Sequence, residues 1–322
     1  MTHGWQVVHH PFTLDPVISA GELRALGITA QMIPGLVKRG SLIPLSRGWY
    51  ATTAPTTAAQ RHQLLTTAAV RSFQDRCVPS HYSALLQAGL PLYNADVTTV
   101  HLARVDRGNS ISRPGLVVHR PVPPGAVVRP EMRLDLGLAI AQTGITCGPI
   151  AALIAADAAL HRRLVTPPDI SQGLDWIRGH PGTGQLDTFL QLADGSSESP
   201  GETRLRHVFH LMRCPVVPQS WIRDGAFAAR VDFELVDARV IVEFDGLVKY
   251  GSSVTRPGEP DGRHALIAEK QREDRLRELG YDVVRVTWRD LDDPASLSRR
   301  INAAIARSRA RHGSGVRGTS LA

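Results

Sequence analysis

Residues 230–246, RVDFELVDARVIVEFDG, consist of two short apolar runs that each carry acidic residues. Side chains alternate between the two faces of a β-strand, so we predict strands over 229–236 and 239–245 joined by a two-residue turn at Asp237 and Ala238. One face of this hairpin would be apolar and buried: Val231, Phe233, Leu235, Val240, Val242 and Phe244. The other face would carry the acidic side chains.

The turn determines which residues of the hairpin lie opposite each other. Asp232 faces Glu243 in this register, and Arg230 faces Asp245. Directly opposed side chains have Cβ atoms about 4.5–5.5 Å apart, and two carboxylates at that distance destabilise the pair. A shared proton, a nearby arginine or a divalent cation would offset the repulsion. Oxygen-only ligands favour Mg²⁺ or Mn²⁺ over zinc, and the alternative is a solvated sheet face that Arg230 neutralises.

Elements on both sides extend the hairpin into a larger fold. Upstream, Ser199, Pro200 and Glu202 have the spacing of a capping box at a helix N-terminus, which gives Glu202 a purely structural interpretation. Downstream, we predict a helix over 263–280, a third strand over 281–288 and a last helix that starts at Asp293. The predicted order is helix, strand, strand, helix, strand, helix.

Together these motifs resemble the restriction-endonuclease-like PD-(D/E)xK superfamily, and more closely its branch of uncharacterised proteins related to very-short-patch repair endonucleases. The matching pieces are GETRLR, VDFEL, VIVEFDG and KQREDRLRELGYDVVRVTW, which lie within 200–310. The resemblance implies that Asp232 and Glu243 bind the metal and that Glu202 is the acidic residue of the first helix. In the wider superfamily a lysine stands two positions after the glutamate, whereas here that position is Asp245, as in the related branch.

The resemblance implies hydrolysis of DNA phosphodiester bonds with Mg²⁺ or Mn²⁺. A cation on Asp232 and Glu243 would polarise the scissile phosphate and lower the pKa of a bound water, and Asp245 or Glu202 would hold a second cation or orient the water. Lys270, Gln271 or Lys249 would replace the missing lysine. The expected catalytic residues are therefore Glu202, Asp232, Glu243, Asp245, Lys270 and Gln271. Arg272 and Arg275 would contact the nucleic acid backbone or stabilise charge in the transition state, or be ordinary surface charge.

A second set of motifs lies near the start of the chain, in 14–57. Ser19 can cap a short helix that Gly27 stops, and Thr29 can cap a second helix that runs to Lys38. The following SLIPLSRGWYA predicts two short strands around a turn. Helix, turn, helix and hairpin is the order of a winged helix, whose second helix enters the major groove of DNA.

Three cations of this segment, Lys38, Arg39 and Arg47, are placed for phosphate contacts. The alternative is a small packing domain with solvated cations. The pattern ELRALGIT…I..LVKRG.L..L.RGWY resembles the N-terminal domain of AbiEi-type antitoxins. That resemblance implies DNA-binding autoregulation, although such winged helices also serve as accessory modules.

The rest of the chain carries weaker signals. We predict a mixed α/β middle domain over 58–165, a linker over 166–198 rich in Pro, Gly, Asp and Ser, and a disordered tail over 311–322. His81, His101 and His119 raise the question of a metal site in the middle domain. Their spacing matches no metal signature, so we interpret them as core or surface histidines.

Composition narrows the class of protein. The net charge of +7 and the pI of about 9.8 favour a polyanionic partner, but a genome that encodes Arg often would give the same values. Three widely spaced cysteines fit neither a disulfide framework nor a zinc cluster, which favours a reducing cytoplasm. No apolar run has the length of a membrane span and the start lacks the features of a signal peptide, so we expect no membrane association.

Two functions follow from these motifs. The first is a cytoplasmic α/β (α+β) protein that binds DNA and cuts it with a Mg²⁺-dependent endonuclease domain over 199–310. The second is an AbiEi-like type IV antitoxin or transcriptional regulator, with a cognate toxin as partner, in which the nuclease fold is inert. Convergence of Asp232, Glu243 and either Lys270 or Gln271 would favour the enzyme, and a salt bridge of Arg230 in that space would favour the regulator.

Overall fold

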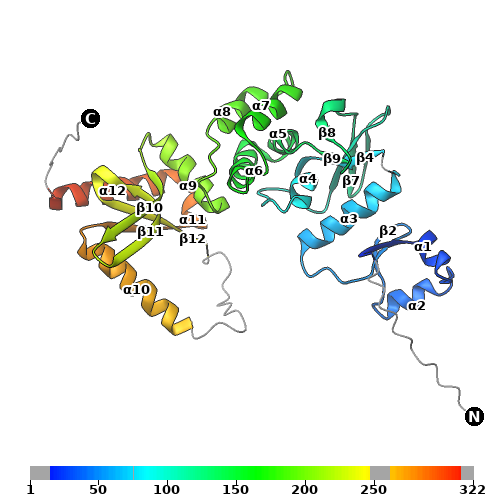
Figure 1. Ribbon diagram of the computed structural model, residues 1–322, viewed down its shortest axis with the longest axis horizontal. Coiled ribbons are helices and arrows are strands. Elements are labelled where there is room, and N and C mark those ends of the chain that lie inside the picture. Colours follow the sequence, from blue (N-terminus) through cyan, green and yellow to red (C-terminus); the bar gives the residue numbers. More distant parts are fainter. Residues whose placement is uncertain (1–14, 75, 247–261, 313–322) are drawn as a thin grey trace, which may run out of the picture. The chain divides into compact units, whose positions relative to one another are not determined.

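The computed structural model describes residues 15–74, 76–246 and 262–312, and it confirms the mixed α/β (α+β) class (Figure 1). The chain divides into two compact units, 1–152 with 167–187 and 153–166 with 188–322. The predicted domains 14–57 and 58–165 thus fall largely into one unit. Within the described residues, no helix is both long enough and apolar enough to cross a membrane.

The first unit begins with the predicted helix, helix and hairpin. It contains β1 (Val17–Ser19), α1 (Ala20–Ala25), α2 (Ile33–Lys38), β2 (Ile43–Ser46) and β3 (Trp49–Ala51). The three strands form a sheet in the order β1-β3-β2. Ser19 caps α1 in a reciprocal capping box with Glu22, and Gly27 follows with a φ of +83°, so both predicted helix signals of α1 are confirmed.

The start of α2 differs from the prediction. The helix begins at Ile33 rather than after a Thr29 cap, and Thr29 instead accepts a turn hydrogen bond from the Met32 amide at 3.0 Å. Pro34 explains the difference, because proline is tolerated only in the first turn of a helix, where its missing N–H would have no partner. A helix that started at residue 30 would place the Pro34 ring against the carbonyl of residue 30.

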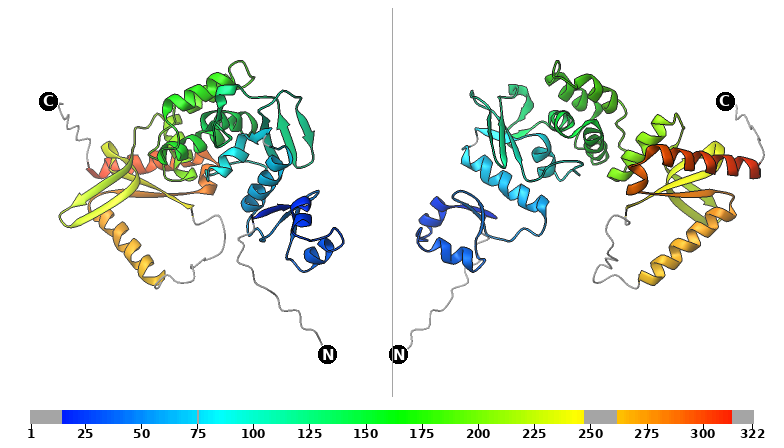
Figure 2. Two further views of the ribbon diagram at one scale, coloured as in Figure 1. Left: turned by 45° about the vertical axis from the view of Figure 1, so that its right-hand side comes forward. Right: turned by 180° about the vertical axis from the view of Figure 1, so that it is seen from behind.

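A long helix and a second sheet complete the order of this unit. α3 (Ala58–Ser72) precedes β4 (Cys77–Pro79), α4 (His81–Gln87), β5 (Val100–Arg104), β6 (Ile111–Arg113) and β7 (Leu116–His119). These strands form a sheet in the order β4-β5-β7-β6, in which β5 and β7 are parallel. α3 lies between this sheet and the small N-terminal sheet (Figure 2), and Leu65 packs against the apolar clusters of both.

Further elements follow in the chain: η1 (Pro124–Ala126), β8 (Val127–Val128), β9 (Arg133–Leu134), α5 (Leu136–Cys147), α6 (Pro149–His161), α7 (Pro167–Trp176) and α8 (Thr183–Leu190). The predicted linker 166–198 therefore contains two helices. The tail predicted over 311–322 begins too early, because residues 311 and 312 end the last helix of the chain, and the rest of the tail lies outside the described residues.

The second unit contains a four-stranded sheet in the order β10-β11-β12-β13. Its elements are α9 (Pro200–Leu211), β10 (Val217–Asp224), β11 (Phe227–Leu235), η2 (Val236–Ala238), β12 (Val240–Asp245), α10 (Gly262–Glu278), β13 (Asp282–Thr287), α11 (Trp288–Leu291) and α12 (Pro294–His312). β10, β11 and β12 are antiparallel neighbours, and β13 is parallel to β12. Figure 1 shows α10 on one side of this sheet and α12 on the other.

The hairpin of β11 and β12 has the predicted register. Glu234 pairs with Ile241 and Leu235 with Val240. The connection is longer than the expected two-residue turn, because residues 236–238 form a 3-10 turn and Arg239 is left-handed, with φ and ψ of 50° and 46°. The register survives because the extra residues extend the loop equally on both strands.

Both faces of the sheet are covered, and this corrects the simple picture of one apolar and one acidic face. Phe233, Leu235, Val240 and Val242 pack with α9, α11 and α12 as expected. Val231 instead joins a second core with Ile241 and Leu276 of α10. β10 was not predicted at all, since in this edge strand only Ile222 is fully buried and the sequence shows no apolar alternation.

Candidate functional site

A row of polar residues crosses the C-terminal sheet. The pairing of Phe233 with Val242 places Asp232 of β11 opposite Glu243 of β12, as predicted. On the outer side, Gln219 of β10 lies at the level of Asp232, between the pairs of the neighbouring residues, and on the inner side Glu243 pairs with Arg285 of β13. The regular ladder of β11 and β12 ends at Asp232, where Oδ2 of the carboxylate accepts the Phe244 amide hydrogen at 2.8 Å.

Asp232 is the most strongly perturbed carboxylate of this row. Burial raises its pKa to about 6, the bond from the Phe244 amide opposes that rise, and the nearby Glu202 and Glu243 carboxylates add to it. Three acidic side chains from α9, β11 and β12 therefore share one electrostatic environment. With a pKa of about 6, Asp232 is mostly ionised at pH 7, but its charge is less stabilised than that of an ordinary aspartate, and a nearby cation would stabilise it.

Glu202 holds the first turn of α9 in place. Ser199 caps the helix, its hydroxyl donates to Glu202 Oε1 at 2.7 Å, and the Glu202 amide donates back to the hydroxyl at 3.2 Å. Oε2 accepts the Glu198 amide at 2.9 Å and the Gln219 side-chain amide at 2.8 Å. The structural interpretation of Glu202 is therefore supported, and Gln219, which has a φ of +52°, links the carboxylate to the sheet.

Arg272 of α10 is the cation at the row. Nη2 donates to Oε1 of Glu243 at 2.7 Å, and Nε donates to Glu269 at 3.0 Å. These carboxylates raise the pKa of Arg272. The sequence predicts for this arginine a nucleic acid backbone contact, a role in stabilising transition-state charge or ordinary surface charge, and none of these includes its pairing with Glu243. The signal that could have found it is the spacing of Glu269, Arg272 and Leu276, which share one face of a helix.

The expected replacements for the missing lysine do not reach the row. Lys270 and Gln271 are exposed, and among the described residues neither has a hydrogen bond or ion pair with its carboxylates. Each residue of an α-helix turns by about 100°, so these two point away when Arg272 faces the sheet. The convergence expected of Lys270 or Gln271 is thus replaced by that of Arg272, and Lys249 lies outside the described residues.

Arg230, the alternative counter-ion, does not pair with Asp232 or Glu243. Its side chain forms an ion pair with Glu198, which precedes α9, and its carbonyl accepts a hydrogen bond from Arg272 at 3.4 Å. Arg275, expected to contact nucleic acid, pairs with Asp224 at 2.5 Å and with Glu278 at 2.8 Å. Among the described residues, neither arginine forms an ion pair with Asp232 or Glu243.

The other two acidic residues of the hairpin have different roles. Glu234 is buried and accepts hydrogen bonds from Ser220 at 2.5 Å and Tyr281 at 2.9 Å, so it is a structural residue of the sheet. Asp245 ends β12, level with Thr287 of β13. Alternation places it on the same face as Glu243.

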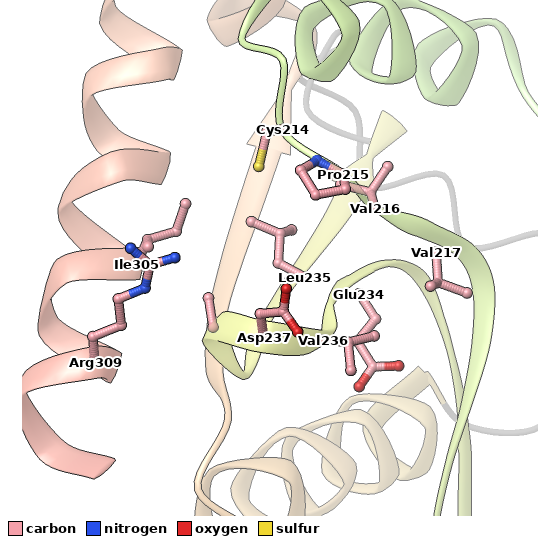
Figure 3. A pocket seen from close by; sticks show the side chains of 11 residues that line it. Cys214, Pro215, Val216, Val217, Glu234, Leu235, Val236, Asp237, Ile305 and Arg309 are labelled. Carbon is pink, nitrogen blue, oxygen red and sulfur yellow. The ribbon is translucent and has the colours of Figure 1, made fainter. Parts of the chain in front are cut away.

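A small cavity of about 180 Å³ lies near the hairpin but away from the row (Figure 3). It is lined by the segment from Cys214 to Val217, the turn at Val236 and Asp237, and the α12 side chains Ile305 and Arg309. Neither Asp232 nor Glu243 lines it, so it is not the candidate site.

The donor set fits a hard divalent cation. Asp232 and Glu243 offer carboxylate oxygens, the ligands that Mg²⁺ and Mn²⁺ prefer, and the raised pKa of Asp232 marks a place where a cation would relieve repulsion. In the described part of the chain, Glu202, Asp232 and Glu243 do not bring three ligand oxygens within 4.8 Å of one another. A cation would therefore rest on two protein carboxylates and solvent, which suits Mg²⁺.

The predicted nucleic-acid contacts of the first unit lie on its surface. Lys38, Arg39 and Arg47 are exposed, at the end of α2 and in the turn between β2 and β3. Among the described residues none of the three has an acidic partner, which leaves their charge available to an anion.

No model of a known protein family matches this chain, and no curated protein matches it either.

Proposed function

We propose that this protein binds DNA and that its C-terminal unit hydrolyses phosphodiester bonds with Mg²⁺ or Mn²⁺. The observation that carries the proposal is the environment of Asp232, which lies opposite Glu243 in the sheet and near the Glu202 carboxylate of α9, and which has a pKa of about 6. Structural carboxylates are usually held by partners that lower their pKa. Strong perturbation by burial and like charge is typical of functional sites.

Each residue of the site would have a separate role. Asp232 and Glu243 would hold the cation, which supplies Lewis acidity and a more acidic bound water. Glu202 would fix the helix end and, through Gln219, the position of β10. Arg272 would take the role of the superfamily lysine, because its guanidinium, once Glu243 turns to a cation, would stabilise charge on the phosphate.

DNA is the proposed partner of the first unit. The net charge of +7 and the three exposed cations Lys38, Arg39 and Arg47 support binding to a polyanion. The free thiols Cys77, Cys147 and Cys214 agree with a reducing cytoplasm as the place of action.

The test combines binding with chemistry. Mn²⁺ and Mg²⁺ are titrated into the full chain and into Asp232→Asn by calorimetry, and both proteins are incubated with supercoiled plasmid. We expect binding and nicking by the wild type and loss of both in the variant, while Lys270→Ala, which removes an exposed cation of α10, retains them. Equal behaviour of the wild type and Asp232→Asn would overturn the proposal.

One observation favours a second function, a DNA-binding regulator of AbiEi-like type with an inert nuclease fold and a cognate toxin as partner. Arg272 already neutralises Glu243, at 2.7 Å, as a structural ion pair would. DNA binding that persists without any metal binding or nicking in the wild type would establish this second function.

A further inference from the structure

Three histidines far apart in sequence meet in the first unit. β5 and β7 are parallel, with His101 paired to Val117 and Ala103 to His119, so both imidazoles lie on one face of the sheet. α4 begins with His81 directly after β4 and covers that face. One ring nitrogen from each histidine can be chosen so that all three lie within 4.8 Å of one another.

The three imidazole rings lie in contact with one another. His101 Nδ1 lies 2.9 Å from His119 Nε2, and the rings of His81 and His119 stack with centroids 4.1 Å apart. A tetrahedral Zn²⁺ with bonds of 2.0–2.1 Å requires nitrogens about 3.3 Å apart. Because one nitrogen pair lies at 2.9 Å and the third nitrogen within 4.8 Å, the rings would reorient to bring all three nitrogens onto one ion.

The backbone holds His81 in an unusual conformation. Its φ is +52°, in the left-handed region that residues with a side chain rarely adopt. The Ser80 amide donates to the His101 carbonyl at 3.0 Å, and the His81 amide donates to the Gln142 side chain at 3.2 Å. Such strain persists where surrounding structure imposes it, and it gathers at functional sites. Here it directs an imidazole at the two others.

A hydrogen bond orients the ring of His81. Ser80 Oγ lies 3.1 Å from His81 Nδ1, which fixes the ring and leaves Nε2 for an ion.

A cavity borders two of the three histidines. His81 and His119 line a cavity of about 410 Å³, together with Gln142, Trp176 and His180. Structural zinc sites are closed by four protein ligands, whereas sites with three ligands leave the fourth position to water or substrate.

We propose that His81, His101 and His119 bind one divalent transition-metal ion of the Zn²⁺ class, with a fourth position open to this cavity. Imidazole nitrogens select Zn²⁺, Co²⁺, Ni²⁺ or Cu²⁺ over the Mg²⁺ and Mn²⁺ that carboxylates favour. The site is independent of Asp232 and Glu243, which belong to the other unit.

The test uses Co²⁺ as a coloured substitute for Zn²⁺. The sequence also has His3, His9 and His10 near its start, and these would bind metal adventitiously. The reference protein is therefore the full chain with those three changed to Gln, purified without a polyhistidine tag. We expect one equivalent of Co²⁺ to give the visible absorption of a tetrahedral ion, and Zn²⁺ to displace it.

Variants in the reference protein identify the ligands. His119→Gln and His101→Gln should weaken binding by more than the roughly 10–100-fold that loss of an outer partner costs. Two controls should change it less than tenfold: His180→Gln, in the same cavity, and His161→Gln, an exposed residue whose Nδ1 lies 2.9 Å from the Gly195 carbonyl.

Two results would overturn the proposal: no binding by the reference protein, or an unchanged Co²⁺ spectrum in a folded His119→Gln. Near-ultraviolet circular dichroism shows whether each variant folds. If neither does, X-ray absorption of the Zn²⁺-loaded reference protein decides, since three imidazole ligands support the site and fewer contradict it.

Discussion

Arg272 on α10 and Glu243 on β12 form an ion pair of 2.7 Å across the C-terminal sheet and its covering helix. The same guanidinium holds Glu269, at 3.0 Å. The acidic row therefore has a counter-ion supplied by the protein itself. Any divalent cation that binds Glu243 has to compete with this arginine.

That competition leads to the first prediction. Arg272→Gln removes the competing charge, so we expect Mn²⁺ to bind about tenfold more tightly, a change of about 1.4 kcal/mol in binding free energy. We also expect plasmid nicking to fall, because the guanidinium no longer stabilises the phosphate. Calorimetry and a nicking assay measure the two effects. Arg275→Gln, on the same helix but paired with Asp224, is the matched control and should change neither. Weaker Mn²⁺ binding in Arg272→Gln would show that the arginine supports the cation site.

The pKa of Asp232 gives a second prediction. Its folded value of about 6 lies above the ordinary value of 3.8, so the folded state binds more protons between these pH values and wild-type stability falls as pH rises through 6. Asp232→Asn keeps an acceptor for the Phe244 amide and removes the charge. We expect it to be about 1–2 kcal/mol more stable at pH 7, with the gain vanishing toward pH 4.

Urea unfolding of both proteins from pH 4 to 8 measures this difference. Asp237→Asn, on the exposed turn after β11, should change stability by less than about 0.5 kcal/mol. A loss of stability in Asp232→Asn at pH 7 would mean that the carboxylate is a structural partner.

A third prediction concerns Asp157 of α6, which is 1% exposed. It accepts from Arg206 at 2.6 Å, from Thr203 at 2.8 Å and from the Asp194 amide at 2.8 Å. Asp157→Ala leaves these donors and a mostly buried cation unpaired, so it should cost about 3–5 kcal/mol. Asp224→Ala, which breaks a more exposed pair, should cost less than about 1 kcal/mol. Urea unfolding followed by circular dichroism compares the two.

The fourth prediction tests the surface of α2. If Lys38 and Arg39 contact phosphates, the double change to Ala should lower the slope of log affinity against log salt by about 1.8, since each contact contributes about 0.9. Fluorescence anisotropy with duplex DNA at about 50–200 mM salt measures this slope. A protein with Arg107→Ala and Arg113→Ala carries the same charge change on other exposed positions. Equal slopes in the two doubles would exclude a specific role of α2.

The sequence was most informative where a local rule decides the structure. Alternation in β11 and β12 predicted the register and the meeting of Asp232 with Glu243, because slipping by one residue would expose an entire apolar face. The caps at Ser19 and Ser199 were equally local. Pro34 in the sequence also indicates that the helix starts at residue 33, but the prediction gave more weight to Thr29 as a cap.

Long-range geometry could not be predicted. Whether Lys270, Gln271 or Arg272 reaches Glu243 depends on the rotation of α10 over the sheet, which side chains on both elements set together. β10 was missed because an edge strand with one buried side chain leaves no period in the sequence. The sequence could not predict that the histidines cluster, because metal signatures describe residues close in sequence, whereas parallel strands bring together residues 18 positions apart, such as His101 and His119.

The position of α3 has a practical meaning. Its residue Leu65 packs against both sheets of the first unit, and Ala68 belongs to the core beneath β1, β2 and β3. A fragment that stops at residue 57 would lack α3 and would leave that core exposed on one side. We therefore expect that residues 14–57 do not fold stably on their own. The two sheets should therefore melt as one cooperative block, and ligand binding at either one should protect amides of the other from hydrogen exchange.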